Sequence, residues 1–435
     1  MLAEIGVASL QELFDRQIPA AVRLQRALDL PAGMAEQDVY AHLRALGAAN
    51  TSAEDEITFL GAGMYDHYVP AVIDMLMGRS EFLTPYTPYQ PEISQGGLQV
   101  MFEYQTAISE LTALPVSNAS VYEGPSAVAA AAYLAKAANG KPKVVVSRAV
   151  HPHSRAALRT LAAGYGHEIV EVGLSDGVTD PDAWARAIDQ DTSAVIFQQP
   201  NFLGAVEDAA ALAGAAKDSP AVVVGSYDPI PLGILKPPGE CGVDVAVGEG
   251  QTLGNRLDFG GPSFGFFAAT EAYLRRMPGR IAGETVDRNG ERAFVLTLQT
   301  REQHIRREKA TSNITSNQTL LALGGLVTLS WLGPQGLREV GERSMALAEH
   351  TKQALGLPLA FDQPTSHEFC VRTGRPAGEV IAAAKRRGVH PGYRIGRDYE
   401  GLDDAIMVAL TEKRTVADIE HLAEVLSDVL AEVPA

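Results

Sequence analysis

The chain has 435 residues, and its 46% hydrophobic and 20% charged residues are typical of a globular protein, which excludes a mostly disordered chain. Its 36 Lys and Arg residues against 53 Asp and Glu residues give a formal net charge of −17, which argues against nucleic acid or an anionic membrane as partner. The start of the sequence lacks the basic region of a signal peptide, and no apolar run is long enough to cross a bilayer, so we expect a cytoplasmic protein without a membrane span.

Residues 1–60 are expected to form an N-terminal helical arm, because apolar residues recur there at helical spacing. The residues with this spacing are Leu10, Leu13, Phe14, Val39, Leu43 and Leu46. Residues 61–100 are rich in glycine and proline, which predicts a mostly irregular segment of the kind that often carries functional residues.

From about residue 100 to residue 320, helical and strand-like segments alternate. Helices are expected over 99–113, 125–138, 154–163, 181–190 and 207–216. Short apolar runs typical of strands lie at 144–146, 169–172, 194–197, 222–224, 243–247 and 264–268. Continuous apolar strands separated by helices predict an α/β fold with a largely parallel sheet that helices cover on both faces.

The pattern changes after residue 320. Long helices are expected over 319–331 and 335–355, shorter ones over 377–387 and 415–431, and strands over 367–371 and 406–410. This mixture is typical of a small α+β domain. We therefore predict a helical arm (1–60), a large α/β domain (61–320) and a small C-terminal α+β domain (321–435).

The segment 119–127 predicts a short strand, a glycine turn and an alanine-rich helix. A helix N-terminus offers free N–H groups and partial positive charge, which suit a phosphate. The alternative is an ordinary helix start that Ser126 or Glu123 caps.

Two further segments follow predicted strands. Asp228 lies at the carboxyl end of strand 222–224, where α/β sheets bind ligands and where pyridoxal-phosphate enzymes place the partner of the ring nitrogen. The alternative is the turn chemistry of an Asp-Pro pair. His151, in the sequence His-Pro-His, could stack on a planar cofactor ring, or could simply form local hydrogen bonds in a loop.

The glycine-dense loop 247–262 is where a Schiff-base lysine would be sought, yet the chain has no lysine between Lys236 and Lys309. The two cysteines, Cys241 and Cys370, lie far apart in no paired motif, so neither a disulfide framework nor a metal site is expected.

Residues 300–318 form the most basic stretch of the chain, with Arg301, Arg306, Arg307 and Lys309 followed by compact polar residues. Such a segment can hold a phosphate or the carboxylates of a partner. The alternative is a solvated helix with ion pairs to Glu302 and Glu308.

Three strings carry a resemblance to a known family: LGAGMYDHYVP at 60–70, YTPYQPEISQG at 86–96 and REKATSNI at 307–314. The sequence resembles the P-protein of the glycine cleavage system, glycine decarboxylase, in its two-chain form, and it is most similar in pattern to subunit 1, the α chain. The resemblance extends over the whole chain.

The resemblance implies a type I pyridoxal-phosphate fold, with a mostly parallel seven-stranded sheet in the large domain. It also implies a reaction in which subunits 1 and 2 decarboxylate glycine, release CO2 and transfer the aminomethyl group to the lipoyl arm of the H-protein. In this family the Schiff-base lysine and the covalently held pyridoxal 5'-phosphate belong to subunit 2, the β chain, in an α2β2 assembly. The matching position here holds Gln251.

By this resemblance, two groups of residues would have roles at the interface with subunit 2, and a third group would form a pocket that persists as architecture and not as a second working site. The residues expected to complete the active site are Tyr86, Thr87, Tyr89, Gln90, Glu92 and Ser94. Those expected to face the partner's cofactor are Thr311, Ser312 and Asn313, and a vestigial pocket would comprise Ser126, His151, Asp228 and Gln251.

Two alternatives stay open. The chain could be a non-catalytic scaffold that docks the H-protein. It could instead be a self-sufficient pyridoxal-phosphate enzyme that uses Lys236 or Lys309.

Overall fold

The structure is a computed structural model that describes residues 1–310, 312–314 and 316–433, in two compact units, Met1–Ser52 and Ala53–Ala435. The first unit contains helices α1 (Leu2–Ile5), α2 (Leu10–Gln17) and α3 (Glu36–Gly47). The predicted helical positions near residues 10–14 and 39–46 fall on α2 and α3. Helix α2 begins at Ser9, whose hydroxyl accepts a hydrogen bond from the Glu12 N–H at 3.1 Å, an ordinary N-cap.

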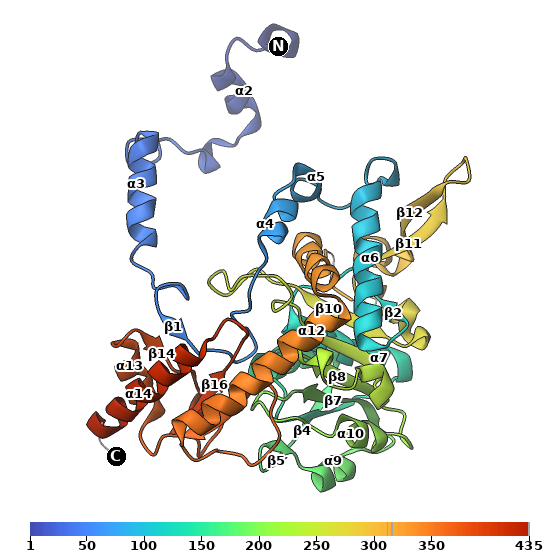
Figure 1. Ribbon diagram of the computed structural model, residues 1–435. Coiled ribbons are helices and arrows are strands. Elements are labelled where there is room, and N and C mark those ends of the chain that lie inside the picture. Colours follow the sequence, from blue (N-terminus) through green and yellow to red (C-terminus); the bar gives the residue numbers. More distant parts are fainter. Residues whose placement is uncertain (311, 315, 434–435) are drawn as a thin grey trace. The chain divides into compact units, whose positions relative to one another are not determined.

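The second unit is organised around a seven-stranded sheet of order β2-β10-β9-β8-β7-β3-β4 (Figure 1). Strands β4, β3, β7, β8 and β9 are mutually parallel, and β10 runs antiparallel to both β9 and β2. The bounds of these strands are β2 Val116–Ser117, β3 Lys143–Ser147, β4 Glu168–Val172, β7 Thr192–Gln199, β8 Val222–Tyr227, β9 Val245–Glu249 and β10 Gly265–Ala269. The predicted strands and the mostly parallel sheet are confirmed.

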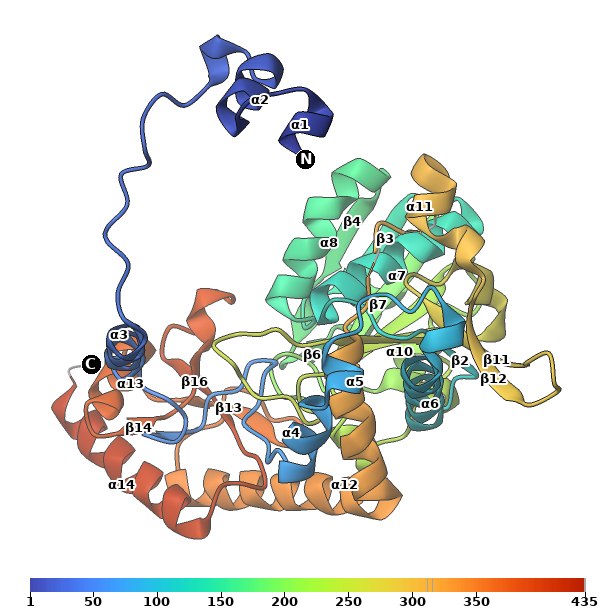
Figure 2. The ribbon, with the colours of Figure 1, turned by 90° about the horizontal axis from the view of Figure 1, so that it is seen from above.

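Alternate residues of each strand belong to two separate cores, as the pleat of a strand requires. Val145 packs with helices α6 (Gln95–Thr112), α9 (Pro181–Ala187) and α10 (Ala209–Gly214), whereas Val144 and Val146 pack with α7 (Gly124–Asn139) and α8 (Pro152–Tyr165). Both faces of the sheet are therefore covered, which explains the continuous apolar runs in the sequence. Figure 2 shows α7 and α8 side by side.

Helix α12 (Thr319–Leu355) runs from the large sheet toward the C-terminal part of the unit (Figure 1). Its length and apolar composition would allow it to cross a membrane, but Leu326 and Leu337 belong to the core on the sheet. The backbone leaves helical geometry at Gly333, with φ of 61°, just before Pro334, which divides the element where the sequence predicted two helices. We therefore interpret α12 as a core helix.

The C-terminal part contains a three-stranded sheet of order β13-β16-β15, covered by α13 (Ala377–Lys385) and α14 (Val416–Glu432). Thr415 and Asp418 form a reciprocal capping box at the start of α14. The bounds of the three strands are β13 Glu368–Arg372, β15 Tyr393–Arg394 and β16 Ala405–Ala409. Two short strand pairs lie elsewhere in the unit. Strand β1 (Ile57–Thr58) pairs with β14 (Val389–His390), and β5 (Leu174–Ser175) pairs with β6 (Val178–Thr179).

Two local expectations differ from the structure, and three elements were not predicted. Residues 61–100 contain short helices α4 (Ala71–Met77), α5 (Ser80–Leu83) and the 3-10 turn η2 (Pro91–Ile93), so the segment is more regular than its glycine and proline content indicates. The strand expected at 120–122 is a single bridge between Val121 and Gly265, because Ser120 has a φ of 108° and bends the chain. The sequence also did not predict the hairpin of β11 (Ile281–Val286) and β12 (Arg292–Thr297) or helix α11 (Gln303–Arg306).

Candidate functional site

A cavity of about 390 Å³ lies at the carboxyl ends of the parallel strands, where open α/β sheets bind ligands. It brings together the loops after β3, β7, β8 and β9 with the start of β13. Its polar lining residues include Tyr65, Glu123, His151, Gln198, Asn201, Ser226, Asp228, Glu249, Thr252, His367 and Glu368. Asp228 and His151, both predicted, are among them, and neither Lys236 nor Lys309 is.

Gln251 is buried beside this cavity, with 1% of its surface exposed. Its Oε1 accepts a hydrogen bond from the Tyr65 N–H at 2.9 Å, and its Nε2 donates to the Tyr65 carbonyl at 3.0 Å and to the Asn255 carbonyl at 2.8 Å. The amide at the position expected for a lysine therefore serves as a structural connection between the loop after β9 and the segment 60–70.

The N-terminus of α7 is occupied by the chain's own carboxylates. Glu249 accepts from the Gly124 N–H at 3.0 Å, and Glu123 accepts from the Ser126 N–H at 3.0 Å and from the Ser126 hydroxyl. Pro125 has no N–H, and the Ala127 N–H donates to the Glu123 carbonyl. The capped-helix alternative is therefore what the structure contains, and burial raises the pKa of Glu249.

His151 makes local hydrogen bonds with both ring nitrogens. Nδ1 accepts from the His153 N–H at 3.0 Å, and Nε2 lies 2.9 Å from the Ala62 carbonyl, to which it donates in the neutral tautomer. Burial lowers the pKa of His151 to about 4, so the ring is neutral at pH 7. The ring lines the cavity, but its hydrogen bonds are those of an ordered loop histidine.

Asp228 organises a turn, which is the alternative that the sequence left open, and it also lines the cavity. Its Oδ1 accepts from the Ile230 N–H at 3.1 Å and from the Thr252 hydroxyl at 3.4 Å. Its Oδ2 lies 3.3 Å from Nε2 of His367, without the alignment of a hydrogen bond.

Tyr65 and Glu368 form a second buried pair in the cavity wall. The Tyr65 hydroxyl donates to Glu368 Oε2 at 2.8 Å, and the Ala62 N–H donates to Oε1 at 2.8 Å. Burial raises the pKa of Glu368 to about 7 despite these hydrogen bonds. The sequence did not predict Tyr65, His367, Glu368 or Glu249 as site residues. The one signal that could have identified Glu249 is its acidic side chain at the end of an apolar strand, β9, next to the glycine-dense loop.

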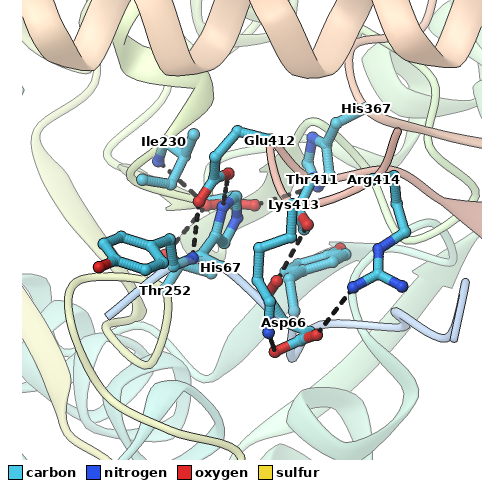
Figure 3. Close-up of polar contacts among 12 residues, drawn as sticks. Asp66, His67, Ile230, Thr252, His367, Thr411, Glu412, Lys413 and Arg414 are labelled. Atoms are coloured by element: carbon cyan, nitrogen blue, oxygen red, sulfur yellow. Dashed lines mark hydrogen bonds and ion pairs between the residues drawn. The ribbon is translucent and has the colours of Figure 1, made fainter. Parts of the chain in front are cut away.

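The segment 60–70 is fastened to the C-terminal part of the chain next to the cavity (Figure 3). Asp66 forms ion pairs with Lys413 at 2.6 Å and Arg414 at 3.4 Å, and His67 Nδ1 contacts Glu412 at 2.7 Å. Burial alone would raise the pKa of Glu412, but hydrogen bonds from His67 and the Tyr68 N–H outweigh it and lower the pKa. These contacts explain the roles of Asp66 and His67 in this mostly apolar string.

A second cavity, of about 630 Å³, lies under the segment 81–101. Tyr86, Thr87 and Ser94, all predicted site residues, line it together with Arg280. Tyr86 is 87% exposed and Ile93 is 80% exposed, so the rim presents apolar surface to solvent. Such a rim is typical of a surface that another chain covers.

Arg280 is buried, and its Nη2 donates to the Tyr89 hydroxyl at 3.2 Å while its guanidinium lies 5.5 Å from the centre of the Tyr89 ring. Glu302, also buried, lies 3.6 Å from Arg280 Nε. Arg280 thus fixes the position of the Tyr89 side chain. The predicted residues Gln90 and Glu92 lie on the same segment and are exposed.

The other predicted residues lie apart from the central cavity. Ser126 serves at the start of α7, as described above, and Thr311 lies outside the described residues. The Ser312 hydroxyl accepts from the Ile314 N–H at 3.1 Å, and Asn313 is exposed. In the basic stretch, Arg301 is buried and donates to the carbonyls of Met277 and Gly279, so it is internal rather than part of a solvated basic helix.

Comparison with known proteins identifies the family. The family described as glycine cleavage system P-protein matches residues 1–426. A probable glycine dehydrogenase (decarboxylating) subunit 1 of Carboxydothermus hydrogenoformans is 48% identical over 429 residues, which cover 98% of this chain and 96% of that protein. The chain belongs to the glycine cleavage system P-protein family. The corresponding subunit 1 of Brevibacillus brevis is 45% identical over 433 residues, covering 99% of this chain and 96% of that protein.

Solved structures agree with this assignment to the P-protein family. A crystal structure of glycine decarboxylase (P-protein), in inhibitor-bound form, matches with a TM-score of 0.93 and 43% identity, covering 99% of this chain and 97% of that one. The cysteine desulfurase CsdA of Escherichia coli matches with a TM-score of 0.66 at 14% identity, covering 90% of this chain and 99% of that one, a likeness of fold alone. The predicted type I fold of pyridoxal-phosphate enzymes is confirmed.

The central cavity of this P-protein chain does not fit the cofactor of its fold class. Gln251 stands where the lysine would be sought, and its amide is fully used by backbone groups. The N–H groups that start α7 already donate to Glu249 and Glu123, so they offer no free donor to a phosphate. No Lys or Arg is among the described residues that line the cavity.

Proposed function

We propose that this chain is subunit 1 of a two-chain glycine decarboxylase and contributes to an active site whose pyridoxal phosphate is held by subunit 2. With subunit 2 it decarboxylates glycine, releases CO2 and passes the aminomethyl group to the lipoyl arm of the H-protein, in an α2β2 assembly in the cytoplasm. The curated relatives carry the name glycine dehydrogenase (decarboxylating) subunit 1, which supports this assignment.

The observation that carries the proposal is the buried Gln251. An enzyme that forms an imine with its cofactor needs a lysine amine at this place. Here the amide joins two segments of backbone, and no Lys or Arg is among the described residues that line the cavity beside it. Both observations support a chain that has no cofactor of its own and works beside a partner that carries one.

The residues that we propose for the shared site lie on the segment 86–94. Tyr86, Thr87 and Ser94 line the second cavity, and Arg280 fixes the Tyr89 ring beneath the same segment. The exposed side chains of Tyr86 and Glu92 are available to a partner chain. Ser312 and Asn313, with Thr311, are proposed to face the partner's cofactor. The exposed apolar rim around Ile93 supports a protein partner.

Reconstitution tests the proposal. The purified chain should release no CO2 from glycine, and activity should appear when subunit 2, pyridoxal phosphate and lipoylated H-protein are added. Glycine decarboxylation by this chain alone would contradict the proposal. A borohydride-stable cofactor label on Lys236 or Lys309 would favour a self-sufficient enzyme.

The same system separates a catalytic contribution from docking of the H-protein. For Tyr89→Ala and Glu92→Ala, a lower kcat at saturating H-protein would support a contribution to the active site. An unchanged kcat with a higher KM for the H-protein would support a docking subunit only.

A further inference from the structure

The Tyr89 side chain contacts two groups that come from outside its own segment. The Arg280 guanidinium lies 5.5 Å from the centre of the ring, and its Nη2 donates to the Tyr89 hydroxyl at 3.2 Å. The His304 ring packs edge-on against the same ring, with 5.7 Å between the ring centres and 66° between the planes. Tyr89 is 49% exposed, so part of its surface is still available to a partner chain.

One carboxylate connects these two groups. Glu302 Oε2 lies 3.6 Å from Arg280 Nε and also 3.6 Å from His304 Nδ1. Glu302 is 7% exposed and Arg280 is 4% exposed, so solvent and salt screen their attraction only weakly. Because Arg280 Nε has no hydrogen-bond partner among the described residues, the charge of Glu302 is what orients this end of the guanidinium.

The backbone keeps Glu302 in a defined place at the start of α11. Its carbonyl accepts from the Arg306 N–H at 2.9 Å, and its own N–H donates to the Gln299 carbonyl at 2.9 Å. Its side chain makes no capping hydrogen bond to the helix that follows, which leaves the carboxylate for Arg280 and His304. Both partners of Tyr89 therefore depend on one anchored carboxylate.

The buried ion pair determines geometry more than it determines stability. The cost of removing two charges from water offsets much of the attraction between them, so such a pair is weak evidence for a stabilising role. Glu302 holds one end of the Arg280 guanidinium, and the other end holds the Tyr89 hydroxyl. Tyr89 belongs to the segment 86–94, and a small displacement of a residue in an active site costs rate steeply.

We propose that Glu302 is a positioning residue of the shared active site. It orients Arg280 and His304, and these two side chains hold Tyr89 in place at the interface with subunit 2. This inference rests on the proposed function. In this role Glu302 touches neither glycine nor the cofactor and transfers no proton.

Acetylation of tyrosine hydroxyls by N-acetylimidazole, located by mass spectrometry, tests the first step in the isolated chain. Glu302→Gln keeps the size of the side chain but removes its charge. The Tyr89 hydroxyl should then react severalfold faster, because Arg280 is no longer oriented toward it. Tyr86, which is 87% exposed, is the internal reference and should react equally in both chains. Unaltered reactivity of Tyr89 in the folded variant overturns the proposal.

The kinetics of the enzyme reconstituted with subunit 2 test the second step. Glu302→Gln should lower kcat about tenfold and leave KM for glycine within about twofold, and Glu302→Asp, which keeps the charge, should recover part of the loss. In a Tyr89→Ala background Glu302→Gln should lower kcat no further, because Glu302 acts through Tyr89. Independent losses in the double variant would show a merely structural role and overturn the proposal.

Glu284→Gln is the matched control, because it alters a carboxylate that pairs with Arg292 on the exposed hairpin β11–β12, and it should leave kcat unchanged. If Glu302→Gln does not fold, His304→Gln replaces it, since the His304 side chain is 47% exposed. That variant should lower kcat severalfold, and an unchanged kcat in it or in folded Glu302→Gln overturns the proposal. An inactive unaltered chain with subunit 2 contradicts the proposed function instead, and acetylation of Tyr89 then decides the role of Glu302.

Discussion

Gln251 makes hydrogen bonds to both backbone groups of Tyr65, accepting from its N–H at 2.9 Å and donating to its carbonyl at 3.0 Å. The two residues are 186 positions apart in the chain. This pair joins the glycine loop after β9 to the segment 60–70, which ion pairs in turn fasten to the C-terminal part of the chain. A neutral amide, with one acceptor and two donors, suits this place better than an ammonium group does.

Gln251→Lys should therefore destabilise the chain rather than restore a cofactor site. A lysine cannot accept from the Tyr65 N–H, and its charge would be buried without a short ion pair. We expect the free energy of unfolding to fall by about 3 kcal/mol or more, measured by urea denaturation. Gln251→Leu, which removes the hydrogen bonds without adding charge, should lose about 2 kcal/mol. A Gln251→Lys chain of unaltered stability that forms an imine with pyridoxal phosphate would contradict this account.

Removing the two carboxylates at the start of α7 should create an anion site. In the double variant Glu123→Ala/Glu249→Ala, the N–H groups of Gly124 and Ser126 become free, and two negative charges disappear. The variant should be less stable by about 1–2 kcal/mol per lost cap. Inorganic phosphate should raise its Tm but not that of the unaltered chain.

A matched control is Asp208→Ala, which removes the cap of α10 away from the cavity. It should lose comparable stability and gain no response to phosphate. Stabilisation of the unaltered chain by phosphate that increases in Asp228→Asn, which removes a negative charge from the cavity wall, would show that the cavity accepts anions after all.

Arg280→Gln should lower the activity of the reconstituted enzyme by positioning Tyr89 and its segment less precisely. The variant loses both the hydrogen bond to the Tyr89 hydroxyl and the contact with the ring. We expect kcat/KM for glycine to fall about tenfold or more, since small displacements of a site cost rate steeply. Tyr89→Phe, which keeps the ring but not the hydroxyl, should fall less.

Arg292 provides the comparison for this variant, because it also lies over an aromatic ring, 4.9 Å from the centre of Phe294, but on the exposed hairpin β11–β12. Arg292→Gln should leave kcat/KM unchanged. Equal losses in both arginine variants would mean that Arg280 has no special part in the site.

Glu368 should make stability depend on pH. Its pKa in the folded chain is about 7, above the ordinary value of 4.5 that it takes when unfolded. The folded state thus binds more protons between these values, and this group's stabilisation, complete below about pH 4.5, is lost as the pH rises through about 7. The histidines with lowered pKa, such as His151, act in the opposite direction.

The difference between the unaltered chain and Glu368→Gln isolates this contribution. The variant keeps an acceptor for the Ala62 N–H but cannot ionise. Relative to the variant, the unaltered chain should lose free energy of unfolding between pH 5 and pH 8. A constant difference over that range would mean that Glu368 ionises normally.

The sequence by itself determined the framework of this protein. The apolar runs around Val144–Val146 and Val222–Val224 predicted buried parallel strands, because residues that alternate between two covered faces must all be apolar. The same reasoning located Asp228 at a strand end, and the absence of a lysine after β9 could be read directly. These properties depend on neighbours in the chain, so local spacing is sufficient to predict them.

Only the tertiary structure decided what the cavity contains. Tyr65 and Glu368 are 303 residues apart, and Glu249 contacts the start of α7 from the end of β9, so no spacing in the sequence predicts either contact. Whether the N–H groups of a helix start face a ligand or the chain's own carboxylates depends on which loops the sheet brings together. The contact between Arg280 and Tyr89 is a further example, because nothing in the sequence around Arg280 predicts it and only the folded chain shows it.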